Sequence, residues 1–132
     1  MLQAPEIPGA EEVVAWFGYW PTFHDAEVVS INLDRKSGCR LVINAFRMTS
    51  ALDEEGKYVC AKHAIVTFVL EGFPMDENGI VNNRIDSFNQ QNVLSSLWIN
   101  RIPEGYEMVL EGCYGVEGKL VASHIAVELE PA

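Results

Sequence analysis

The feature that most constrains the fold is the alternation of apolar and polar side chains with a period of two. In residues 26–34, the apolar Val29, Ile31 and Leu33 are separated from one another by single polar residues. Successive side chains of a strand point to opposite faces, so this spacing predicts a strand with one buried face. A turn and a second apolar run over residues 39–48 predict that the strand belongs to a hairpin.

Further segments with strand character follow along the chain. Residues 58–70 form the run richest in β-branched and aromatic residues, and they come after an acidic loop predicted over residues 51–57. On one face of this strand we expect the inward side chains Cys60, Ala64, Val66, Phe68 and Leu70. Other strands are predicted near Ile80, Val81, Ile85 and Phe88, and over residues 93–101, 106–112 and 119–130. The glycine-rich linker 114–118 predicts that the last two form a hairpin.

The chain carries a single clear helix signal. Two prolines and a glycine predict that residues 1–10 form an irregular arm, and residues 10–18 then follow helical periodicity. Val13, Trp16 and Phe17 have the i, i+3, i+4 spacing that places side chains on one helix face. We therefore expect one short helix that buries this face.

Together these signals predict an α+β fold. It consists of about seven strands in a predominantly antiparallel sheet or sandwich, with the short N-terminal helix packed on an edge or end. The chain has 132 residues, 48% of them hydrophobic, so residues 1–132 are expected to form a single domain. Strands and helices do not alternate, which argues against a parallel nucleotide-binding sheet.

The charge of the chain restricts its partners. Aspartate and glutamate number 19 against 9 lysines and arginines, a formal net charge of -10. Residues 67–132 hold 10 of the acids and 3 of the bases, and therefore -7 of that charge. Such a chain repels phosphate backbones and anionic membrane surfaces, whereas a basic protein would be attracted to it. The alternative is that the charge serves solubility alone.

The three cysteines favour a reducing compartment. The chain has an odd number of cysteines, and none of them forms a CxxC pair. All three lie in strand-like settings, where we expect small buried thiols: Cys39, Cys60 and Cys113. There is no signal-peptide pattern and no apolar run of the roughly 20 residues that span a bilayer, so a cytoplasmic location is expected. No nucleophile motif and no cofactor motif are present, and we therefore expect no enzymatic activity and no cofactor.

The densest group of ionisable and aromatic side chains lies between the predicted helix and the first strand. Residues 20–28 contain Trp20, Pro21, Phe23, His24, Asp25 and Glu27. An imidazole beside two carboxylates is able to bind a metal or to transfer protons, but no HxH or HxxxH spacing supplies further ligands. The alternative is a structural corner, in which the aromatic rings enter the core. His24 would then bond a backbone carbonyl, and the Asp25 carboxylate would accept backbone N–H bonds.

Two other patterns have both a functional and a structural interpretation. Gly112, Gly115 and Gly118 are spaced like a phosphate loop, but no Lys-Ser/Thr pair follows them, so a hairpin is the favoured explanation. The amide-rich stretches 82–84 and 89–92 suit contacts with protein or carbohydrate, and they equally suit an exposed sheet edge. We favour the edge.

The corner also carries a family resemblance. The segment Y-W-P-T-F-H-D-A-E-V at residues 19–28 resembles the start of the Imm50-type immunity proteins of bacterial polymorphic toxin systems. That resemblance implies an α+β fold and a cytoplasmic, non-enzymatic protein that protects its producer by binding a cognate toxin. It covers about ten residues and fixes no toxin-contact residue.

The sequence therefore leads to one preferred function and two alternatives. The preferred one is an immunity-type protein whose carboxylates, among them Asp53, Glu54 and Glu55 or those of the acidic second half, meet a basic toxin site. The first alternative is a small metal- or ligand-binding domain or enzyme centred on His24, Asp25 and Glu27. The second is a homo-oligomeric structural domain that pairs through an exposed strand edge.

Overall fold

The computed structural model describes residues 4–34, 36–56, 58–74 and 83–131. In these residues the chain forms one helix and eight strands, and every strand pairing is antiparallel. The elements are α1 (Ala10–Phe17), β1 (Glu27–Asp34), β2 (Gly38–Leu52), β3 (Tyr58–Glu71), β4 (Arg84–Asp86), β5 (Val93–Ile102), β6 (Gly105–Tyr114), β7 (Glu117–Ala122) and β8 (His124–Pro131). The predicted class, a mostly antiparallel sheet with one short helix, is confirmed, with eight strands in place of seven.

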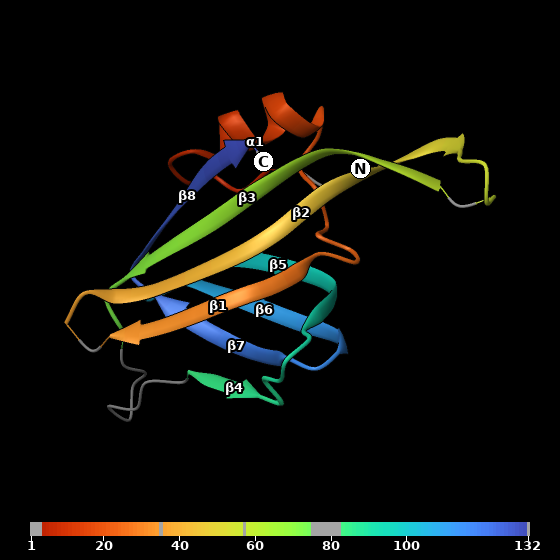
Figure 1. Cartoon of the computed structure of the whole chain (residues 1–132). Helices are drawn as coiled ribbons and strands as arrows, with labels where there is room; N and C mark the ends of the chain where they lie inside the picture. Colours follow the sequence, from red (N-terminus) through yellow and green to blue (C-terminus); the bar gives the residue numbers. More distant parts are fainter. Residues whose placement is uncertain (1–3, 35, 57, 75–82, 132) are drawn as a thin grey trace.

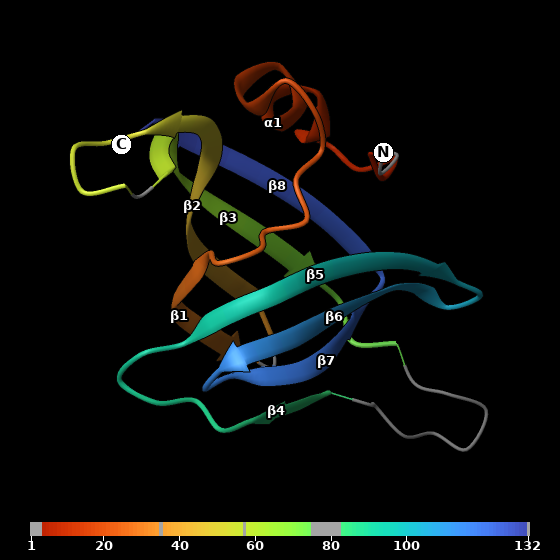
Figure 2. The same cartoon turned by 90° about the vertical axis from the view of Figure 1, so that its right-hand side faces the viewer.

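The strands form one continuous sheet that folds over on itself. Their order is β4-β7-β6-β5-β1-β2-β3-β8. Figures 1 and 2 show the result as two layers, one made of β1, β2, β3 and β8 and the other of β5, β6, β7 and β4. The layers are joined through a single registered pair, Glu27 with Val93, and by a hydrogen bond from the Val28 N–H to the Asn92 carbonyl.

The core lies between the two layers. On β3, Ala64, Val66, Phe68 and Leu70 are all buried, which confirms the face predicted for this strand. The side chain of Cys60 lies outside the described residues. Across from β3, the second layer contributes buried side chains from three strands, among them Leu94, Leu97, Met108, Leu110 and Leu120.

The predicted inward face of the first strand is wrong at Val29 only. Ile31 and Leu33 lie opposite the buried Leu41 and Cys39, although Leu33 is 54% exposed, whereas Val28 is 2% exposed and Val29 is 46% exposed. The reason is a β-bulge: Val28 lies opposite Ile43 and Ser30 lies opposite the neighbouring Val42, so Val29 is an extra residue. A bulge shifts the alternation by one position, which the period-two pattern alone does not reveal.

The final predicted strand is two strands. Residues 119–130 break at Ser123, whose N–H donates to the carbonyl of Glu71. The residues before the break pair with β6 and β4, and those after it pair with β3, so the chain changes layer at this point. The predicted pairing of the last segment with residues 106–112 holds for β7 only.

Two other segment boundaries differ from the sequence-based prediction. The second strand continues to Leu52, so only residues 53–56 of the predicted acidic loop form a turn in the described part of the chain. The strand predicted around Ile85 has three residues, and Phe88 lies beyond it with a side chain that is about half exposed. Ile80 and Val81 lie outside the described residues.

The helix packs on the outer edge of the first layer, as predicted. Val13 and Phe17 are fully buried, Trp16 is partly buried, and the Trp16 indole donates a hydrogen bond of 2.9 Å to the carbonyl of Lys62. Just before the helix, the carbonyl of Pro8 accepts the N–H of Val127 at 2.9 Å, so the arm covers the free edge of β8. No helix in the described residues is long and apolar enough to cross a bilayer.

We predict that the contact between the arm and β8 makes Gly9 irreplaceable. A Cβ atom on Gly9 would meet the Val127 carbonyl oxygen, whereas one on Gly56, which also has positive φ, would meet nothing within 4 Å. Gly56→Ala should therefore cost only the left-handed backbone penalty of about 1–2 kcal/mol. Gly9→Ala should cost at least about 3 kcal/mol, because it also breaks a backbone hydrogen bond. Urea unfolding of the two variants measures the difference, and equal losses of stability would contradict the assignment.

Candidate functional site

The corner predicted from residues 20–28 inserts aromatic side chains between the layers. α1 ends at Phe17 and is capped by Gly18, which has φ of 86°, and the chain then runs across to the second layer. The Trp20 and Phe23 rings are edge-on at 5.9 Å between centroids, and both contact the Phe68 ring edge-on, at 6.4 and 5.7 Å. Such pairs contribute about 0.5–1.5 kcal/mol each beyond the area that they bury. The three rings thus tie the corner to the centre of β3.

The backbone of the corner pairs with β5. Asp25 N–H donates to the Leu94 carbonyl at 2.8 Å, Leu94 N–H donates to Ala26 at 2.9 Å, and Leu97 N–H donates to Thr22 at 2.9 Å. To make these bonds, Phe23 and Asp25 adopt φ of 62° and 64°, in the left-handed region. This conformation is costly for a bulky residue such as Phe, so the surrounding contacts must hold it in place.

His24 is exposed and bonded to the backbone. Its Nδ1 lies 3.0 Å from the carbonyl oxygen of Ser95, so the neutral ring carries its proton on Nδ1 and donates it there. The Nε2 atom lies 3.6 Å from the Asp25 carboxylate, with both side chains substantially exposed. The predicted bond from His24 to a backbone carbonyl is therefore observed. Asp25 contributes to the corner through its backbone N–H, in place of the expected acceptance by its carboxylate.

The residues of the metal-site alternative are not gathered in space. Among the described residues, no group of three or more His, Cys, Asp and Glu side chains is close enough to hold a metal ion. Glu27 is exposed at the start of β1. The other histidines lie apart: His63 lies beside the Phe46 ring on β3 and β2, and His124 begins β8.

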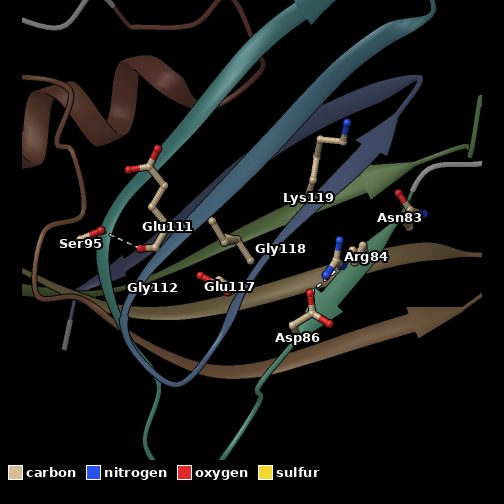
Figure 3. A pocket seen from close by; sticks show the side chains of 10 residues that line it. Asn83, Arg84, Asp86, Ser95, Glu111, Gly112, Glu117, Gly118 and Lys119 are labelled. Carbon is tan, nitrogen blue, oxygen red and sulfur yellow. Dashed lines mark hydrogen bonds and ion pairs between the residues drawn. The ribbon is translucent and has the colours of Figure 1, made fainter.

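A large hollow lies elsewhere, on the second layer. Figure 3 shows a groove of about 910 Å³ along β5, β6, β7 and β4. Its lining includes Asn83, Arg84, Asp86, Ser95, Leu110, Glu111, Gly112, Glu117, Gly118 and Lys119. A polar groove of this kind offers carboxylates, one guanidinium and one ammonium group to a solute.

Most charged groups of the groove already have partners within the protein. The Arg84 side chain contacts the Asp86 carboxylate at 2.6 Å, and Lys119 lies 3.8 Å from Glu107. The Glu111 carboxylate accepts the hydroxyl of Ser96 at 2.7 Å. Both basic groups of the groove thus lie beside carboxylates, which leaves little positive charge to select an anionic ligand.

The three evenly spaced glycines have structural roles, which supports the hairpin interpretation of their spacing. Gly115, with φ of 80°, forms the turn between β6 and β7, and a Cβ on Gly112 would clash with the Val116 carbonyl oxygen. A Cβ on Gly118 would clash with the Arg84 carbonyl oxygen, so this glycine permits the close approach of β4. The sequence singled out these glycines but gave no signal for the groove that they help to form.

The amide-rich stretches divide between an edge and a buried turn. Arg84 lies on the edge strand β4, as predicted, and Asn82 lies outside the described residues. Asn92, in contrast, is buried, and the expectation of an exposed amide is wrong for it. Its side-chain oxygen accepts the N–H groups of Asn89 and Val116, and its amide nitrogen donates to the Asn89 carbonyl. Asn92 therefore fastens the turn before β5 to the β6–β7 hairpin.

The acidic residues predicted as a partner surface lie at the tip of the β2–β3 hairpin. Figure 1 shows that this hairpin extends beyond the body of the protein. Asp53, Glu54 and Glu55 are all exposed at its turn. The turn is closed by a bond from the Gly56 N–H to the Asp53 carbonyl, and the Asp53 carboxylate accepts the N–H of Glu55 at 2.9 Å. The carboxylates are therefore presented on an ordered turn.

The described thiols do not resemble an activated nucleophile. Cys39 is buried, and burial raises the pKa of its thiol to about 11, so the reactive thiolate is disfavoured at neutral pH. Cys113 is an exposed free cysteine on β6, contrary to the expectation that it would be buried.

Comparison with known proteins adds no relative. No family model, no curated protein and no solved structure matches this chain. Fold and site thus define an antiparallel α+β protein in which the corner at residues 20–28 is held by aromatic contacts and by backbone hydrogen bonds to β5. The resemblance of residues 19–28 to immunity proteins stays a prediction.

We predict that the corner depends on its aromatic side chains and not on its ionisable ones. Phe23 is 3% exposed and contacts two rings, so Phe23→Ala should lower the free energy of unfolding by about 3–5 kcal/mol. His24→Ala removes one exposed hydrogen bond and one exposed contact with the Asp25 carboxylate, so its loss should stay below about 1.5 kcal/mol. Chemical denaturation of the two variants provides the comparison. A larger loss for His24→Ala would show that the imidazole holds the corner.

Proposed function

We propose that this protein is an immunity-type binding protein that neutralises a cognate protein toxin without catalysing a reaction. The observation that carries the proposal is the projecting β2–β3 hairpin, whose turn exposes Asp53, Glu54 and Glu55 in a chain of net charge -10. The resemblance of residues 19–28 to immunity proteins supports the same class. Cytoplasmic location and the absence of a cofactor belong to this proposal.

The mechanism that we propose is occlusion of a basic surface. A strongly negative protein accelerates the approach of a positive partner, and complementary charges then fix how the two proteins dock. Carboxylates on a projecting turn reach into a concave site more readily than carboxylates on a flat sheet. A toxin that cleaves nucleic acid has such a basic concave site, because it must bind phosphates.

The two alternatives have less support. The polar groove could hold a small ligand, but both of its basic groups lie beside carboxylates of the protein itself. A homo-oligomer would bring together chains that each carry a formal charge of -10, which opposes association. For a metal or catalytic site at His24, Asp25 and Glu27, the described residues offer no gathered set of ligands.

The proposal is tested by the product of the gene next to this one. We expect that product to arrest growth when it is expressed alone in a bacterial host, and coexpression of this protein to restore growth. The purified pair should coelute as a complex. A neighbouring product that is harmless, or one whose toxicity this protein does not relieve, would overturn the proposal.

The role of the hairpin turn is tested by measuring the association rate of the same purified pair at several salt concentrations. Glu54→Lys/Glu55→Lys should slow association by about tenfold or more and abolish most of its salt dependence, because it reverses the charge at the contact. Glu104→Lys/Glu117→Lys makes the same change in net charge on the second layer and should slow association far less. Equal effects of the two double variants would show that only the overall charge matters.

A further inference from the structure

The outer part of β1 has an unpaired backbone edge. On one side, this strand pairs with β2 over its whole length. On the other side, the pairing with β5 is limited to Glu27 with Val93 and to the bond from the Val28 N–H to the Asn92 carbonyl. Among the described residues, no backbone bond joins the remainder of that edge, residues 29–34, to another segment. The bulge at Val29 marks the point at which the strand leaves the second layer.

The protein covers parts of two other edges. The edge of β8 is covered at Val127 by the arm, through the bond from Val127 N–H to the Pro8 carbonyl. The edge of β5 is covered over residues 94–97 by the corner, through three bonds to residues 22–26. At the end of the sheet, β4 is only three residues long. Open edges invite pairing with another chain, and the open part of β1 adds exposed apolar side chains to such an edge.

The side chains of this edge also lack the usual protection. No lysine and no proline occurs in residues 28–34, although these are the residues that commonly block edge pairing. Val29 is 46% exposed and Leu33 is 54% exposed, so apolar surface accompanies the open backbone. Leu33 lies opposite the buried Cys39, so it is on the inner face, at a place that the second layer does not cover.

We propose that the free edge of β1 accepts an extended, basic segment of a partner protein as an additional strand. Backbone hydrogen bonds would provide affinity, and alternate side chains of the added strand would cover Ile31 and Leu33. The formal charge of -10 favours a lysine- or arginine-rich strand and disfavours a second copy of this chain. The proposal concerns how a partner is held and applies whether or not that partner is a toxin.

The test uses peptides of defined sequence with the intact protein. The first peptide has seven residues, in which lysines alternate with valine and threonine, and the second replaces each lysine with glutamate. We expect the lysine peptide to shift the backbone amide NMR signals of residues 29–34, and the glutamate peptide to shift them little. No binding, or signal changes centred on another surface such as residues 53–56, would overturn the proposal.

A matched pair of substitutions locates the contact. Leu33→Lys places a lysine on the inner face of the open edge. The free protein should tolerate this lysine, because the position is exposed, but an added strand would bury its charge. It should weaken peptide binding by about tenfold, the effect of losing one close interaction. Leu52→Lys makes the same change at a residue that is 60% exposed on the hairpin and should leave binding unchanged. Equal weakening by both variants, or dimerisation of the unmodified protein through β1, would contradict the proposal.

Discussion

The contact between the corner and the two layers is the interaction on which the rest of the structure depends. The strand ladder joins the layers at one registered pair, Glu27 with Val93. The corner adds three backbone hydrogen bonds to β5 and places Trp20 and Phe23 against Phe68 at the centre of β3. Three edge-on ring pairs contribute about 2–4 kcal/mol in total, more than an exposed polar contact such as that of His24 with Asp25. The aromatic rings, and not the charged groups, therefore hold the fold closed at this point.

The same corner determines which edges of the sheet remain open. By pairing with β5 before it turns into β1, the chain protects the second layer and leaves the outer part of β1 without a neighbour among the described residues. The first layer is protected on its far side by the N-terminal arm. A strongly acidic protein with an open edge at β1 and a projecting acidic hairpin is well suited to holding a basic partner. This arrangement connects the fold to the binding function that we propose.

The strands were predictable from the sequence where alternation is uninterrupted. Residues 58–70 show this most clearly, because Ala64, Val66, Phe68 and Leu70 all face the core as expected. Prediction failed where a local irregularity or a distant partner decides the outcome. The bulge at Val29 depends on the register with β2. The break at Ser123 arises because β7 pairs with β6, whereas β8 pairs with β3. In the same way, Asn92 is buried because Val116 and Asn89 donate to it, a pairing between segments that no local pattern encodes.

Amide hydrogen exchange of the free protein shows whether the corner holds the two layers together. The N–H groups of Asp25, Leu94 and Leu97 bond across the junction of corner and β5. If the corner holds the layers together, these amides should exchange only by global unfolding, with the same protection as the central amides of β3. Exchange of the three amides at the rate of the exposed turn at residues 53–56 would contradict the account, because the layers would then separate without unfolding.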